Sequence, residues 1–250
     1  MDERELIKKR LLELNRTAQE HCYFTFTDFL GLAEQTVLRE VIATVHPSVT
    51  LYGGAEGSER VMARFGNTEE LGYDAPFPIA LLKIAPKSPK YADKLTHRDF
   101  LGALLNLGIE RDTLGDIVIR DKVGYLFCKE DIAPYIMESL ERIKHTDVTV
   151  SVAGELPEGE LYRTEVRRIQ IASERLDAVI ARVFSLSRED AQLLFRRSLV
   201  FRDGALVESA SYTPRSGERI SVRGHGRFIY LGTVGATKKG RLNAEVELFI

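Results

Sequence analysis

Cysteine is scarce in this 250-residue sequence, which limits the kinds of site that the chain can build. Cys22 and Cys128 lie far apart, with neither the spacing of a disulfide framework nor that of metal ligands. Both suit a reducing compartment, where a free thiol packs as a small hydrophobic group. The histidines are equally scattered, so the sequence predicts no bound metal. They are His21, His46, His97, His145 and His225.

Long apolar runs are also missing. No stretch approaches the ~18 apolar residues needed to cross a membrane, and the opening "MDERELIKKR" is charged throughout rather than arranged as a targeting signal. The sequence therefore predicts a cytoplasmic protein without membrane insertion. No internal repeat or low-complexity tract is present, and 44% hydrophobic residues are enough to build packed cores.

Nucleotide-binding and kinase fingerprints are absent. The glycine-rich "YGGAEGSER" lacks the Gly-Lys-Ser/Thr ending that brings a lysine to terminal phosphates. The tripeptide in "THRDF" stands without the glycine loop, strand lysine or Asp-Phe-Gly of a kinase. Thr96 and Asp99 have instead the spacing of a helix capping box. The sequence thus predicts neither a cofactor nor a small-molecule substrate.

Charge is present but uneven. The whole chain carries a formal charge of −2. Residues 173–250 hold 13 Lys and Arg against 9 Asp and Glu, or +4, while residues 1–172 hold 22 against 28, or −6. Starting the basic segment at Tyr162 raises its charge to +6. A basic end on an acidic body is typical of a polyanion-binding module, although plain solvated surfaces also show it.

Apolar periodicity divides the chain into three regions and predicts an α+β protein. Residues 1–73 are predicted to be mainly helical, with Thr27 as the N-cap of a second helix and a further helical piece after the glycine turn. Residues 74–155 follow the order βαββαβ, the ferredoxin-like split motif that many RNA-binding sheets share. Residues 162–250 form the basic module. The first helix is predicted to bury Leu6, Ile7, Leu11 and Leu14.

The aromatic residues of the middle region do not match those of the best-known RNA-binding sheets. In "VGYLFCK", Tyr125 and Phe127 alternate along a predicted strand, but the surrounding glycine-aromatic signature is missing. Packing within the sheet is therefore preferred over base stacking for both rings.

The stretch "SERLDAVIARVFSLSREDAQLLFRRSLVFRDG" predicts two short helices and a hairpin. Ser173 and Ser187 are the expected N-caps. In the second helix Ala191, Leu194 and Phe195 should face the core, and Asp203-Gly204 is a hairpin turn. The first helix has an apolar stripe of Leu176, Val179, Ile180, Val183 and Phe184.

The outward face of the second helix carries donors for RNA. Arg188, Gln192 and Arg196 follow one another at intervals of four residues, so they share one side. Two guanidinium groups and an amide suit phosphate oxygens and RNA edges. In "VRGHGRF", Arg223 and Arg227 flank two glycines and would clamp a phosphate. Phe228 could stack on a base, but a core contact is preferred.

The ordered segments "RLDAVIA", "LSREDAQLLF", "LVFRDG" and "SGERISV" resemble the S4-type RNA-binding domain, named for a small-subunit ribosomal protein. Arg175-Leu176-Asp177 superficially matches the catalytic tripeptide of pseudouridine synthases. Those enzymes place the aspartate in a separate large domain with a different following turn. Asp177 is therefore predicted to pair with a nearby arginine and not to act as a nucleophile.

Over nearly its full length the chain resembles the YlmH family of bacterial S4-type proteins, whose chloroplast and cyanobacterial relatives are photosystem II S4 domain proteins. The resemblance rests on "YGGAEGSER", "LTHRDFLGALLNLGIERDTLGDIVI", "ISVRGHGRF" and "TKKGR". It implies a cytoplasmic, ribosome-associated protein without catalytic residues. The family is associated with ribosome-associated quality control, with large subunits that carry peptidyl-tRNA, and with cell-division phenotypes.

The predicted function is non-catalytic binding to structured RNA, namely the large ribosomal subunit or tRNA, in ribosome quality control. One alternative is an RNA-modifying enzyme targeted by the S4-type module, but residues 1–153 show neither a cofactor fingerprint nor an acid/base constellation. Another is an interaction factor for cell division or photosystem assembly. The predicted RNA-binding residues are Arg175, Ser187, Arg188, Gln192, Arg196, Arg197, Arg202, Arg223, Arg227, Lys238, Lys239 and Arg241.

Overall fold

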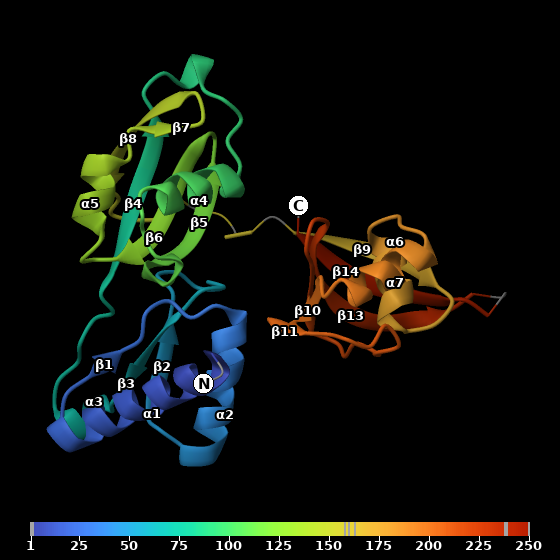
Figure 1. Ribbon diagram of the computed structural model, residues 1–250, viewed down its shortest axis with the longest axis horizontal. Helices are drawn as coiled ribbons and strands as arrows, with labels where there is room; N and C mark the ends of the chain where they lie inside the picture. Colours follow the sequence, from blue (N-terminus) through green and yellow to red (C-terminus); the bar gives the residue numbers. More distant parts are fainter. Residues whose placement is uncertain (1–2, 158, 160, 163, 238–239, 250) are drawn as a thin grey trace. The chain divides into compact units, whose positions relative to one another are not determined.

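The computed structural model describes residues 3–157, 159, 161–162, 164–237 and 240–249 (Figure 1). It is a mixed helix and sheet structure, which confirms the predicted α+β class. The chain separates into two compact units, Met1–Leu161 and Tyr162–Ile250. No described helix combines the length and apolarity that a membrane crossing requires.

The N-terminal part of the first unit packs helices against a small antiparallel sheet of order β1-β3-β2. Leu11 of the first helix and Val41 of the second are buried with Phe65 of β3 in one cluster. Its elements are α1 (Glu3–His21), β1 (Thr25–Phe26), α2 (Leu32–Val45), β2 (Val49–Tyr52), β3 (Met62–Phe65) and α3 (Thr68–Leu71).

Three local predictions for this part are wrong. The segment after the glycine turn was predicted to be helical, but it forms strand β3. This strand pairs with both β1 and β2. Thr27 does not cap α2, which begins at Leu32 after Gly31; its buried hydroxyl accepts the backbone N–H of Ala63 at 2.8 Å. Leu6 is 50% exposed, so it lies outside the buried face of α1.

The rest of the first unit is a five-stranded antiparallel sheet of order β5-β6-β4-β8-β7. The main strands and helices follow the predicted βαββαβ order, and a short strand, β7, is added as a hairpin to β8. The predicted capping box of Thr96 and Asp99 is confirmed. The elements are β4 (Ile79–Pro86), η1 (Pro89–Tyr91), α4 (His97–Asn106), η2 (Arg111–Thr113), β5 (Leu114–Arg120), β6 (Val123–Lys129), α5 (Ala133–Ser139), β7 (Arg142–Ile143) and β8 (Thr146–Val152).

The two faces of this sheet are both covered around its centre. Residues of α4 and α5 pack on one face in a common core. On the other face Phe127 is 2% exposed and packs with Phe29 of the N-terminal part. The backbone of Gly54 approaches so closely that a Cβ there would lie 2.2 Å from the Phe127 ring. Leu156 and Leu161 pack on the same cluster, so this face is closed around Phe127.

The second unit is a six-stranded antiparallel sheet of order β11-β10-β12-β13-β14-β9. Two helices pack on one of its faces (Figure 1). The elements are β9 (Thr164–Ile171), α6 (Leu176–Val183), α7 (Arg188–Arg196), β10 (Val200–Arg202), β11 (Ala205–Leu206), β12 (Arg219–Val222), β13 (Gly226–Ala236) and β14 (Leu242–Phe249).

The core of the second unit follows the predicted stripes. Leu176, Val179 and Ile180 of α6 are fully buried, and Phe228 of β13 joins them in the core. Phe228 is therefore a core residue, as preferred from the sequence. Successive strand residues point to opposite faces, so the neighbouring Arg227 lies on the face without helices, here called the helix-free face.

Helix starts in this unit agree with the sequence in one case and differ in the other. Ser187 caps α7, accepting the N–H of Asp190 at 3.0 Å. Helix α6 begins at Leu176 with Arg175 at the N-cap position, not Ser173. The N–H of Leu176 reaches the carbonyl of Tyr212 at 2.7 Å, so a distant loop takes over the capping.

The predicted hairpin turn is confirmed. Asp203 and Gly204 link β10 to β11 with φ of 46° and 82°. Positive φ at both central residues matches the twist of the flanking strands, which is why Asp-Gly is favoured here.

Candidate nucleic-acid interface

One buried carboxylate organises the predicted RNA-binding residues of α6 and α7. Asp177 is fully buried, and its Oδ1 accepts Nε of Arg175 at 3.2 Å. Its Oδ2 accepts three donors: Nη2 of Arg175 at 3.1 Å, Nη2 of Arg188 at 2.9 Å and Nε2 of Gln192 at 3.1 Å. The predicted pairing of Asp177 with an arginine is therefore confirmed.

The electrostatics of this cluster keep Asp177 ionised. Burial opposes the charged form, but the hydrogen bonds from Arg175 and Gln192 and the charges of Arg188 and Arg175 outweigh it. The net result is a pKa of Asp177 below its ordinary value. The same ion pair raises the pKa of Arg175. A carboxylate with its lone pairs occupied by guanidinium and amide donors orients other groups and is a poor proton acceptor.

The guanidinium groups that Asp177 orients remain accessible. The side chains of Arg175 and Arg188 are 44% and 45% exposed. A guanidinium has five N–H donors, so each keeps donors beyond those directed at Asp177. Arg196 lies on the same stripe of α7 as Arg188 and Gln192 and is exposed. Arg175, Arg188, Gln192 and Arg196 together are called the α6–α7 face.

Arg197 and Ser187 lie at the two ends of α7. Arg197 is the C-cap residue and is exposed; one residue beyond Arg196, it lies about 100° further round the helix and off the stripe. Ser187 uses its hydroxyl within the helix start, where it also donates to Oδ2 of Asp190 at 2.7 Å.

Arg202 is engaged by side chains of its own unit. Its Nη1 donates to the Tyr212 hydroxyl at 2.8 Å and lies 3.8 Å from Oε1 of Glu218. The Tyr212 hydroxyl in turn donates to Glu218 at 2.7 Å. Burial, reinforced by this hydrogen bond, raises the pKa of Tyr212. Arg202 thereby ties β10 to the 207–218 segment.

Arg223 and Arg227 each lie over aromatic rings of the second unit. The Arg223 guanidinium lies over the Phe201 ring at 4.5 Å, whereas that of Arg227 lies between Phe249 at 4.4 Å and Tyr162 at 4.7 Å. Arg227 is on the helix-free face, so the sequence-predicted basic surface is divided between two faces of one sheet.

The predicted tail residues are only partly described. Lys238 and Lys239 lie outside the described residues. Arg241 is exposed, and its backbone N–H donates to the Thr237 hydroxyl at 3.0 Å. The turn between β13 and β14 thus presents at least one guanidinium to solvent.

The first unit contains a groove that the sequence analysis did not single out. It has a volume of about 570 Å³ and lies between α4 and the segment from α5 to β7. Its cations are Arg98, Arg142 and Lys144, and its acids are Asp99 and Glu141. Lys144 is paired with Asp99 at 2.8 Å. The sequence signal for this groove was weak: in "THRDF" and "ERIKH" together, three Lys and Arg residues stand against two acidic ones.

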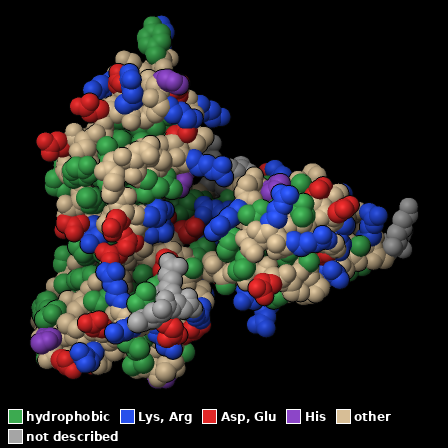
Figure 2. Space-filling model, viewed as in Figure 1, with side chains coloured by type: hydrophobic (Ala, Val, Ile, Leu, Met, Phe, Trp, Pro, Cys, Tyr) green, Lys and Arg blue, Asp and Glu red, His purple; other side chains and the backbone are tan. Residues whose placement is uncertain are grey.

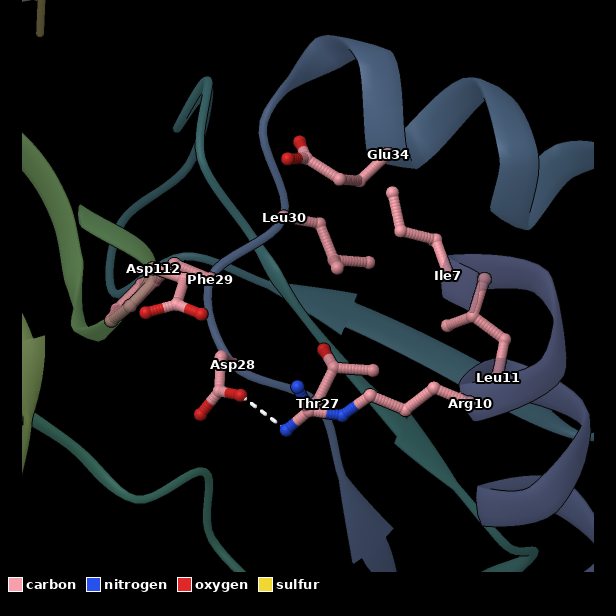
Figure 3. A pocket seen from close by; sticks show the side chains of 9 residues that line it. All are labelled: Ile7, Arg10, Leu11, Thr27, Asp28, Phe29, Leu30, Glu34 and Asp112. Atoms are coloured by element: carbon pink, nitrogen blue, oxygen red, sulfur yellow. Dashed lines mark hydrogen bonds and ion pairs between the residues drawn. The ribbon is translucent and has the colours of Figure 1, made fainter. Parts of the chain in front are cut away.

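A second cavity, of about 190 Å³, lies in the N-terminal part (Figure 3). Ile7 and Leu11 of α1 form its apolar side, and Asp28 and Asp112 contribute carboxylates. Arg10 pairs with Asp28 across it. Asp28 also accepts Lys129 of β6 at 3.0 Å, so these ion pairs connect the N-terminal part with the five-stranded sheet. Within the described residues no group of His, Cys, Asp and Glu has the arrangement of a metal site.

Comparisons with known proteins relate the sequence to one family. A family model described as "Putative RNA-binding domain in YlmH" matches residues 73–154. The ribosome-associated protein quality control protein P2 of Bacillus subtilis (strain 168) is 30% identical over 259 residues, covering 98% of this chain and 95% of that protein.

A solved structure, the cell division protein ylmH from Streptococcus pneumoniae, is 21% identical and covers 61% of this chain and 92% of its own, with a TM-score of 0.49. The identity to the Bacillus relative, which extends over almost the whole of both sequences, is what assigns the family. The chain belongs to the YlmH family.

Proposed function

We propose that this protein is a non-catalytic RNA-binding protein that associates with ribosomes through the α6–α7 face. The observation that carries the proposal is the Asp177 cluster, which holds two half-exposed guanidinium groups and an amide in one arrangement. Fixing these side chains in advance lowers the entropy lost when they bind phosphate oxygens.

The relatives support a ribosomal setting. The Bacillus relative is named for ribosome-associated quality control, and residues 73–154 match a domain described as RNA-binding. We infer that the RNA is that of the large ribosomal subunit or tRNA, and that the protein acts in the cytoplasm. The proposed organisation is an N-terminal region of residues 1–73, a ferredoxin-like domain of residues 74–155 and an S4-type domain of residues 162–250.

The chemistry of the α6–α7 face favours binding over catalysis. Asp177 is fully buried, ionised and hydrogen-bonded to two guanidinium groups and an amide, which makes it a poor nucleophile and proton acceptor. Guanidinium groups that contact phosphates make binding depend on salt, since each neutralised phosphate contributes roughly 0.7–0.9 to the log–log slope. With about 5 such contacts the expected slope is about −4.

The test is co-sedimentation with ribosomal subunits, combined with sequencing of the crosslinked RNA. The variant Arg188→Gln/Arg196→Glu removes two cations from the α6–α7 face without placing a carboxylate beside Asp177. We expect it to abolish large-subunit co-sedimentation. In RNA-binding titrations the log–log dependence of affinity on salt should become less steep by about 1.5. Unchanged co-sedimentation would overturn the proposed face.

The matched control is Arg182→Gln/Arg215→Glu, which makes the same change in net charge at exposed positions of the same unit. Arg182 lies about 140° round α6 from Asp177, and Arg215 lies in a loop. We expect this control to co-sediment as the wild type does. An equal loss in the control would mean that overall charge, and not the α6–α7 face, determines association.

A further inference from the structure

The 87–94 loop follows β4 at one end of the five-stranded sheet, beside the β5–β6 and β7–β8 turns (top of Figure 1). Sheet register places these segments together, because Pro86 pairs with Val148 at this end of the sheet and Ile84 with Gly124 nearby. The opposite end of β4 and β6 is where Lys129 meets the N-terminal part. The loop therefore projects at the end of the domain away from that contact.

Tyr91, in the short helix η1, is 81% exposed, the largest exposure among the large hydrophobic side chains that the structure describes. The next most exposed, Val152, has 65% of its surface accessible. An aromatic ring left almost wholly in water contributes little to folding, whereas such rings dominate binding surfaces when a partner covers them.

The loop that carries Tyr91 is held by several hydrogen bonds. Nζ of Lys122, in the β5–β6 turn, donates to the carbonyls of Pro89 at 3.0 Å and Ala92 at 3.1 Å. The N–H of Asp93 donates to the hydroxyl of Thr146 at 2.9 Å. The ring is therefore presented from an anchored support, which reduces the entropy lost when it binds a partner.

Cations surround this ring. Lys87, Lys90 and Lys94 are exposed, and Nζ of Lys90 lies 5.6 Å from the Tyr91 ring centroid. The one acid of the loop, Asp93, is 39% exposed and accepts the backbone N–H of His145 at 3.3 Å. Figure 2 shows several Lys and Arg side chains at this end of the first unit, together with acidic side chains and a histidine. A base between an aromatic ring and lysines is a common arrangement for single-stranded RNA.

The aromatic positions on the usual RNA surface of such a sheet are buried here. RNA-binding sheets of this fold stack bases on aromatic side chains of the exposed sheet face. In this protein Phe127 is 2% and Tyr125 9% exposed, on the face of the five-stranded sheet opposite α4 and α5. Lys83, Thr149 and Ser151 on the same face are exposed, but its two aromatic rings are buried, so a base that stacks on an aromatic side chain of the 73–154 domain must find that ring elsewhere.

We propose that the 87–94 loop is an RNA-contact element of this domain: Tyr91 stacks on an unpaired base, and Lys87, Lys90 and Lys94 bind the flanking phosphates. This inference rests on the proposed function that the protein binds RNA, and it adds a contact in the first unit to the α6–α7 face of the second. It also predicts which RNA features matter, since stacking requires a base that is free of its partner.

The experiment compares two probes, a labelled RNA hairpin with an unpaired loop and the same stem closed by a minimal loop. The full-length protein should bind the first more tightly, and Tyr91→Ala should weaken that binding about tenfold, within the range for loss of one stacked base. Tyr91→Phe and Tyr91→Trp should retain the affinity because they keep the ring. Equal affinity of Tyr91→Ala and wild type for the unpaired loop would overturn the proposal.

The lysines are tested separately. Lys87→Glu/Lys90→Glu should lower the salt slope for the hairpin by about 1.4, the value expected for two single-strand phosphates. Lys122 is left intact because it anchors the loop. Lys9→Glu, an exposed lysine on α1, serves as the control for a charge change in the same unit and should leave the slope unchanged.

Crosslinking separates this inference from the proposed function. With 4-thiouridine RNA, mass spectrometry should recover RNA attached to the peptide that contains Tyr91, also in the Arg188→Gln/Arg196→Glu variant. Loss of binding in that variant together with normal affinity of Tyr91→Ala would uphold the α6–α7 face and exclude the loop. Crosslinks at Tyr91, together with unchanged RNA binding by the Arg188→Gln/Arg196→Glu variant, would uphold the loop and exclude the α6–α7 face. Recovery of crosslinked RNA at other peptides but none at the peptide that contains Tyr91 would overturn the inference.

Discussion

Nη2 of Arg188 on α7 lies 2.9 Å from Oδ2 of Asp177, a fully buried carboxylate on α6. Arg175 and Gln192 donate to the same carboxylate. The contact joins the two helices through a charged group and at the same time fixes the direction of the Arg188 guanidinium. One aspartate thus contributes both to the packing of the second unit and to the geometry of its basic surface.

Asp177→Asn should weaken both properties. The amide cannot hold two guanidinium groups, so we expect the free energy of unfolding to fall by about 2 kcal/mol in urea titrations. RNA affinity should fall about fivefold even though the protein gains positive charge, because two arginine side chains must then be ordered on binding. Glu189→Gln, an exposed change on α7, is the control. Tighter RNA binding by Asp177→Asn would show that charge outweighs orientation.

Asp99 should make the first unit sensitive to acid. Lys144, followed by the backbone and hydroxyl of Thr96, lowers the pKa of Asp99 to about 2. Since the unfolded-state pKa is about 3.9, the ionised form stabilises the folded state; this contribution is complete above about pH 4 and is lost as the pH falls towards 2. Carboxyl NMR titration measures the pKa directly. Lys144→Gln should raise it, and an unchanged value would exclude the ion pair as its cause.

Tyr212→Phe tests the position of Arg202. Removing the hydroxyl takes away the acceptor of Arg202 and the donor to Glu218, so the free energy of unfolding should fall by about 1–2 kcal/mol. RNA affinity of the folded protein should not change. A large loss of affinity without loss of stability would instead place Arg202 in contact with RNA, as its sequence position suggested.

Gly54→Ala tests the closure of the sheet face. Gly54 has φ of 100°, and an added Cβ would lie 2.2 Å from the Phe127 ring. Strain and overpacking together should cost about 3 kcal/mol in thermal or urea unfolding. Gly102→Ala is the opposite case, since Gly102 lies inside α4 with no atom near the new methyl group. We expect a gain of up to about 1 kcal/mol there.

The two cysteines should differ in reactivity. Burial raises the pKa of Cys128 to about 12, so almost no thiolate forms at neutral pH. Cys22 is exposed. A thiol reagent should therefore modify Cys22 in the native protein and reach Cys128 only after denaturation. Rapid modification of both thiols would mean that the core of the five-stranded sheet opens readily.

Predictions from the sequence were accurate where a structure depends on near neighbours in the chain. The capping box at Thr96, the N-cap at Ser187, the Asp203-Gly204 turn and the apolar stripe of α6 all involve contacts within a few residues. The βαββαβ order was also predictable, because strand and helix periods alternate clearly in residues 74–155. The family resemblance of the whole chain is confirmed by the comparisons.

Predictions failed where the deciding partner lies far away in the sequence. Threonine is a residue type that favours N-cap positions, but the hydroxyl of Thr27 accepts the backbone N–H of Ala63 instead. Ser173 is replaced as a cap by the carbonyl of Tyr212, which lies 36 residues after Leu176. In both cases a backbone group far away in the sequence pairs with the group that the local pattern assigned to a helix cap.

The sequence by itself determined the two short helices of the second unit, the cap of α7, the order of strands and helices in residues 74–155, and the arginines at regular spacing on α7, since these depend on local periodicity and hydrogen bonding. Only the tertiary structure decided which arginines are oriented for a ligand. Asp177 holds Arg188 in place, Tyr212 and Glu218 engage Arg202, and the strand alternation of β13 turns Arg227 to the helix-free face. Side chains with the same charge acquire different roles because packing brings a different neighbour to each.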